Sequence, residues 1–202
     1  MKKTILLFTF ILFCNTTFSQ KNSSSKKTTS SNFLAKIENI SAEVVKNNFY
    51  LFITNKDAKK DTILLKSIDE NKLPLQCKIL PFMAKGVKLY SVSWTENKVT
   101  ETKLKTEDAT TTFTEICNVT SKTKLLSNTQ TTTKIKENHF LDAKQTASET
   151  IQKVRNEGLL LSITVEGDVI LKSKTQENKM TYNPTENKFV NALTTSSNKK
   201  KK

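Results

Sequence analysis

Apolar and polar residues alternate along most of the chain between residues 49 and 135. A period of two is typical of β-strands that bury one face. Two predicted hairpins join residues 49–53 to 62–65 and residues 87–94 to 99–104, the second around Glu96 and Lys98. Further strands are predicted at 75–82, ended by Pro81, at 111–119 and at 123–135. The many threonines suit these strands, because β-branched side chains pack well on a pleated surface.

The stretch from 140 to 157 departs from this alternation. Its apolar residues recur at three- and four-residue spacing, at Phe140, Ala143, Ala147, Ile151 and Val154. This spacing predicts an amphipathic helix, with Asn138 or Asp142 capping its start and Gly158 following its end. A strand at 159–165, a turn at 166–168 and a strand at 169–171 come next. The expected fold is β-rich α+β, a mainly antiparallel sheet or sandwich with one helix (about 140–157) packed on it.

The first residues have the features of an export signal. Lys2 and Lys3 precede an apolar run at residues 5–14, and Thr17 and Ser19 place small residues before a cleavage between Ser19 and Gln20. Residues 1–19 therefore resemble a bacterial secretory signal peptide. The run is short for an uncleaved membrane anchor, and Phe13 is an unfavourable neighbour for lipidation at Cys14. We expect an exported chain, periplasmic or at the cell surface, with no transmembrane segment after cleavage.

Charge is distributed unevenly along the predicted regions. The formal net charge is +14, but residues 1–32 hold five lysines and no acid, and residues 191–202 hold four lysines and no acid. We interpret 20–32 as a flexible linker, 33–190 as one domain and 191–202 as a disordered lysine-rich tail. The two lysine-rich ends are candidates for weak contact with an anionic surface.

Two cysteines, Cys77 and Cys117, remain after cleavage. Each lies on the apolar face of a predicted strand, and exported proteins meet an oxidising compartment. A disulfide between them is the favoured interpretation, and two separate buried thiols are the alternative. A redox function is not expected, because no Cys-x-x-Cys pair occurs.

No arrangement of residues typical of an enzyme stands out. His139, the single histidine, lies near Glu137 and Asp142, but this spacing matches no standard metal motif. The carboxylate pairs Glu107/Asp108 and Glu166/Asp168 are more typical of turns than of a catalytic site. We therefore expect no catalytic residue, no metal and no cofactor.

Nucleic-acid binding is not expected either. Of the 33 basic residues, 32 are lysines and only Arg155 is an arginine, whereas phosphate and base recognition favours the bidentate arginine side chain. The leading hypothesis is a non-enzymatic binding or assembly module for an envelope protein or polymer. The alternatives are a carrier of a small apolar ligand, with Phe49, Tyr90, Trp94 and Phe113 lining its pocket, and a hydrolase with a dispersed site.

Overall fold

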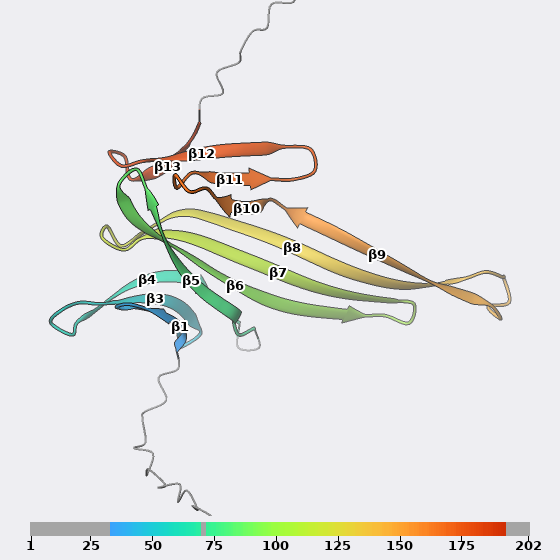
Figure 1. Cartoon of the computed structure of the whole chain (residues 1–202). Coiled ribbons are helices and arrows are strands. Elements are labelled where there is room, and N and C mark those ends of the chain that lie inside the picture. The colour runs from blue at the N-terminus through green and yellow to red at the C-terminus, as the bar shows by residue number, and fades with distance from the viewer. Residues whose placement is uncertain (1–32, 70–71, 193–202) are drawn as a thin grey trace, which may run out of the picture. The chain divides into compact units, whose positions relative to one another are not determined.

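The computed structural model describes residues 33–69 and 72–192, and within them the chain forms thirteen β-strands. The predicted signal peptide with its Ser19–Gln20 cleavage site, the predicted linker and most of the predicted lysine-rich tail lie outside these residues. The strands form three antiparallel sheets, and in each sheet every strand pairs with its neighbour in the sequence (Figure 1). Within the described residues, no helix has the length and apolar character needed to cross a bilayer.

Sheet 1 contains β1 (Phe33–Ile37), β2 (Ile40–Val45), β3 (Asn48–Thr54) and β4 (Lys60–Ser67). Sheet 2 contains β5 (Leu75–Ala84), β6 (Val87–Glu101), β7 (Lys105–Asn118), β8 (Thr123–Phe140) and β9 (Ser148–Gly158). Sheet 3 contains β10 (Leu160–Ile163), β11 (Val169–Lys172), β12 (Glu177–Asn183) and β13 (Lys188–Asn191). The predicted antiparallel, β-rich architecture is confirmed.

Sheet 2 uses its two faces to build two separate cores. Face 1 of this sheet carries Tyr90, Val92, Trp94 and Cys117 into a core with the buried residues of sheet 1. Face 2 carries Leu89 and Ile116 into a second core with Val169, Tyr182 and Phe189 of sheet 3. This division follows from the alternation of side chains along β6 and β7, since consecutive residues point to opposite faces.

The predicted helix at 140–157 is wrong. Residues 148–158 form β9, which pairs with β8 from Phe140↔Ser148 to Gln130↔Gly158. Asp142, expected to cap the helix, instead accepts hydrogen bonds from the backbone N–H groups of Thr146 and Ala147 and shapes the turn between the two strands. Val154 is 65% exposed on β9, so the apolar stripe has no core to cover.

The expected hairpin around residues 96–98 is also wrong. β6 runs without interruption from Val87 to Glu101 because β7 pairs with it along its whole outer part, from Tyr90↔Cys117 to Glu101↔Thr106. Pro81 does not end its strand, since β5 continues to Ala84. A proline is tolerated there because β5 is an edge strand of sheet 2 and only one side of its backbone needs hydrogen-bond donors.

Candidate functional site: the outer ribbon of sheet 2

The cores cover only part of sheet 2. Beyond Trp94 and Phe113 the sheet continues as four long strands whose residues are mostly exposed or half-buried. We call this part the outer ribbon and define it as residues 97–101 of β6, 105–112 of β7, 128–140 of β8, and β9. Because the surface of the outer ribbon is polar, it needs no second sheet to bury it.

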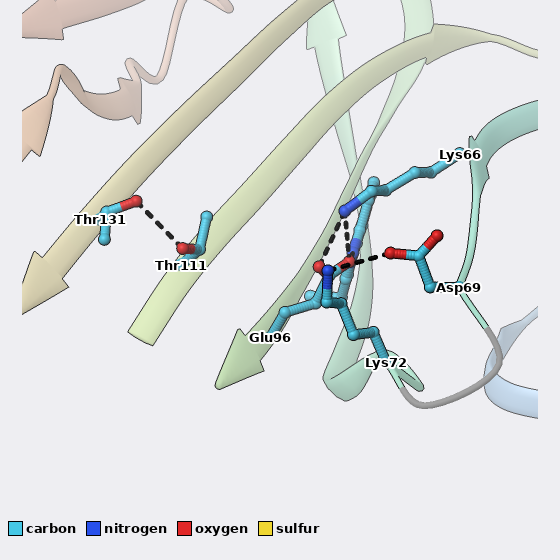
Figure 2. Close-up of polar contacts among 7 residues, drawn as sticks. Lys66, Asp69, Lys72, Glu96, Thr111 and Thr131 are labelled. Carbon is cyan, nitrogen blue, oxygen red and sulfur yellow. Dashed lines mark hydrogen bonds and ion pairs between the residues drawn. The ribbon is translucent and has the colours of Figure 1, made fainter. Parts of the chain in front are cut away.

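A charged cluster marks the boundary between the first core and the outer ribbon. Lys66 Nζ of β4 lies 2.6 and 2.8 Å from the two carboxylate oxygens of Glu96, and 3.8 Å from the ring centroid of Phe113. Trp94 Nε1 donates to the same carboxylate at 3.3 Å. Figure 2 shows this pair beside a second ion pair, Asp69–Lys72, whose hydrogen bond lowers the pKa of Asp69. The cluster joins β4 to β6 where the apolar core ends.

Polar rows continue outward from this cluster along the ribbon. Directly across from Glu96 lies Thr111, and the hydroxyl groups of Thr111 and Thr131 share a 3.0 Å hydrogen bond between β7 and β8 (Figure 2). The next row places Asn97, Thr110, Thr132 and Asn156 side by side. Such cross-strand pairs stabilise a sheet that has little apolar surface to bury.

Ion pairs on the ribbon gather on face 1. They connect Lys105 with Glu107 at 2.7 Å, Lys153 with Glu137 at 3.8 Å, and Arg155 with Glu157 at 3.6 Å. His139 also faces Glu137 on this side, at 3.3 Å. Most basic groups of this face therefore have a carboxylate close by.

Face 2 of the ribbon is different, because it holds lysines without carboxylate partners. Among the described residues, neither Lys134 nor Lys136 has a carboxylate oxygen within 4.0 Å. They line a hollow of about 720 Å³ with Thr106, Asp108 and Gln152, among others. A second hollow of about 510 Å³ shares Val154 with the first and is lined by residues of β8 to β11 and the β11–β12 turn, including Gln130, Lys172 and Lys174. We call the two hollows together the face-2 groove.

The four aromatic residues predicted to line a pocket fill the first core instead. Phe49 and Trp94 are 0% and 1% exposed, with ring centroids 5.0 Å apart in an edge-to-face arrangement. Phe113 stacks on the other side of Trp94 at 5.2 Å. Tyr90 belongs to the same core, and its hydroxyl donates to Glu38 at 3.1 Å. Aromatic packing at these distances stabilises the packing of sheet 1 on sheet 2. None of these four residues lines the face-2 groove.

The two cysteines are free thiols in the structure. Both belong to the first core, as their place on apolar faces predicted, but β6 lies between their strands. Cys117 lies opposite Tyr90, whereas Cys77 lies in the irregular stretch near Ser93 and Thr95. Two strand spacings and at least three residues along the strands separate them, about 10 Å in each direction. A disulfide requires Cα atoms within about 7 Å, so the predicted Cys77–Cys117 bridge is not formed.

The residues considered for catalysis stay apart. Glu107 and Asp108 are consecutive in β7 and point to opposite faces of sheet 2. Asp168 is buried beside Lys179 at 2.8 Å, an interaction that lowers its pKa, while Glu166 is exposed in the preceding turn. Within the described residues no three histidine, cysteine or acidic side chains gather as metal ligands would.

Sequence reasoning missed the groove residues. The run Lys134-Ile135-Lys136 held a usable signal, since alternation alone puts both lysines on the face opposite Ile135. Comparison with known proteins adds nothing to this site: no protein-family model, curated protein or solved structure matches the chain.

Proposed function

We propose that the chain is an exported, non-enzymatic binding module that assembles with another envelope protein by accepting one of its strands at the free edge of β9. The observation that carries this proposal is the length and exposure of that edge. β9 is the last strand of sheet 2 and, at 11 residues, the longest edge strand of the described sheets. Ten of its residues are exposed. An edge of this kind presents a row of unpaired backbone groups to an incoming strand.

The opposite edge of sheet 2 is less accessible, because β5 contacts β1 of sheet 1. On β9, Lys153, Arg155 and Glu157 lie on one face of the strand. Charged side chains on an edge discourage indiscriminate aggregation. They also select for a partner strand whose charges match, so the edge favours a specific partner over self-aggregation.

The alternatives receive less support. A carrier of an apolar ligand rested on Phe49, Trp94 and their neighbours, which are packed against one another. A hydrolase would need carboxylates or His139 to converge in a cleft, whereas His139 is exposed and, among the described acids, only Glu137 lies within ion-pair distance of it.

Export is tested first, by the mass of the protein recovered from the cells that produce it. We expect a mature chain that begins at Gln20 and fractionates with the envelope. A full-length chain beginning at Met1 and recovered with the cytoplasm would contradict the proposal.

Strand addition is tested by photo-crosslinking in the same cells. A benzoylphenylalanine probe at Glu149 of β9 is expected to capture one discrete partner, whereas a probe at exposed Leu64 of β4 is not. Equal capture at both positions would argue against β9. A stable dimer of the purified chain would contradict an envelope partner, because it would assign the edge to a second copy.

Proline variants then separate the backbone from the side chains. Backbone N–H groups along an edge strand point alternately to β8 and to solvent. One of the two variants Thr150→Pro and Ile151→Pro therefore removes a backbone hydrogen bond to β8 and lowers Tm. The other removes only a solvent-facing N–H donor and leaves Tm unchanged. We expect the variant with an unchanged Tm to lose the crosslink, and Thr150→Ala to keep it. Retention of the crosslink by that folded proline variant would refute strand addition.

A further inference from the structure

We infer that the face-2 groove binds an acidic polysaccharide. This inference names a ligand for a surface separate from the β9 backbone edge, so it goes beyond the proposed function while sharing its setting in the envelope. The groove combines length, positive charge and free hydrogen-bonding groups, and together these properties match an extended anionic chain of sugars.

The groove is long enough for several sugar units. Along β8 it runs from Gln130, in the hollow next to sheet 3, to Lys136, near the outer end of the ribbon. Six residues of extended strand separate these two positions, which corresponds to about 20 Å. Val154 lines both hollows, so they adjoin at this residue, and an extended ligand that follows β8 and β9 would contact both.

The charge of the groove favours an anionic ligand. Five lysines line it, at positions 134, 136, 153, 172 and 174, against the single acid Asp108. Two of them offer no free charge to the groove, because Lys153 points to face 1, where it lies near Glu137, and Lys172 pairs with Glu177. Among the described residues, Lys134, Lys136 and Lys174 have no carboxylate within 4.0 Å, so their charges are available to a ligand.

The neutral lining favours sugars over the other anionic polymers. The side-chain amides of Gln130 and Gln152 make no hydrogen bond within the described protein, and Thr106 and Thr175 add hydroxyl groups to the lining. Amides and hydroxyls match the many hydroxyl groups of a polysaccharide. No aromatic side chain lines either hollow, so the stacking that single-stranded nucleic acids require is missing.

Calorimetric titration of the full chain with an oligogalacturonate tests the inference. Neutral dextran, a polyglutamate peptide and a thymidine oligonucleotide are titrated separately for comparison. We expect the oligogalacturonate to bind, and to bind more weakly as salt is raised from 50 to 300 mM NaCl. The triple variant Lys134→Gln, Lys136→Gln, Lys174→Gln should bind about tenfold more weakly, since three exposed charge contacts are lost.

A matched variant controls for net charge. Lys46→Gln, Lys56→Gln, Lys78→Gln removes the same charge from exposed lysines outside the groove, and it should bind as the unchanged protein does. Equal weakening by both triple variants, equal binding of dextran, or tighter binding of the peptide or oligonucleotide would overturn the inference, as would absence of binding. The Thr150→Pro and Ile151→Pro variants, whose sites lie outside the groove lining, distinguish the two proposals. The folded one of them should lose its envelope partner and still bind the oligogalacturonate.

Discussion

Replacement of Gly167 by alanine tests how sheet 3 packs on sheet 2. Gly167 lies in the turn between β10 and β11, where its N–H donates to the carbonyl of Thr164 at 3.0 Å. Its φ is +82°, and a Cβ atom there would lie 2.1 Å from the carbonyl oxygen of Met83 and 2.6 Å from Cα of Ala84. Both atoms belong to the backbone at the end of β5, so no flexible side chain can move away.

The expected cost has two parts. An alanine at positive φ costs about 1 kcal/mol relative to glycine. Relief of the backbone clash adds about 1–3 kcal/mol, the usual cost of overpacking a filled site. Gly86 provides the matched control, because its φ is +80° and a Cβ there would meet nothing within 4 Å. Gly86→Ala should therefore cost only the first part, about 1 kcal/mol.

Urea denaturation of the two variants and the unchanged protein measures the difference. The fluorescence of Trp94, the only tryptophan, reports the first core, and far-ultraviolet circular dichroism reports all three sheets. We expect Gly167→Ala to lose more stability than Gly86→Ala by about 1–3 kcal/mol. Equal losses in the two variants would refute the close contact between the β10–β11 turn and β5.

Three further predictions concern the buried groups of sheet 2. Trp94→Ala removes the fluorescent probe, so its urea denaturation is followed by far-ultraviolet circular dichroism alone. It should lower the free energy of unfolding by about 3–5 kcal/mol, because it empties the centre of the aromatic stack; a loss under about 1 kcal/mol would contradict that packing. Burial raises the pKa of Cys77 to about 11 and of Cys117 to about 12. Iodoacetamide at pH 8 should therefore modify neither thiol until the chain is unfolded. A protein mass that shows a disulfide between the two residues would contradict the register of β5, β6 and β7. Burial also raises the pKa of Glu115, so Glu115→Gln should raise Tm at pH 7. That gain should vanish below about pH 4, where the carboxyl is protonated in both the folded and the unfolded chain; an equal gain at both pH values would show another cause.

Local alternation was sufficient to predict most of the strands, and the mainly antiparallel pairing was expected, but the order of the strands was not predicted. It placed Cys77 and Cys117 correctly on core-facing positions, because the period of two decides the face of each residue. It could not place them along the sheet, since position depends on register, and the irregular stretch between Leu75 and Lys78 shifts the register of β5. The prediction of a disulfide is wrong for that reason, whereas two separate buried thiols were the expected alternative.

The predicted helix does not form, because its apolar stripe has no surface to cover. Ile151 and Val154 are spaced for one helical face, yet on a strand they point to opposite faces, and Val154 is left 65% exposed. β8 offers a continuous edge for pairing along all of β9, so the backbone is satisfied without a helix. Helices in proteins draw most of their stability from packing an apolar face, and both covered faces of sheet 2 were already occupied by sheets 1 and 3.

The net charge of the chain is a poor guide to where an anion would bind, and the register explains why. Lys134 and Lys136 share face 2 because both are even positions of β8, whereas Glu137 points to face 1 with Lys153 within 4.0 Å. The sequence shows this sorting within β8, but only the pairing of β7 with β8 reveals which acids join each face. That pairing puts Glu107 opposite Ile135 on face 1 and leaves Asp108, opposite Lys134, as the one acid of the groove. An anionic ligand is therefore attracted to one face of a ribbon whose other face is neutralised by its own carboxylates.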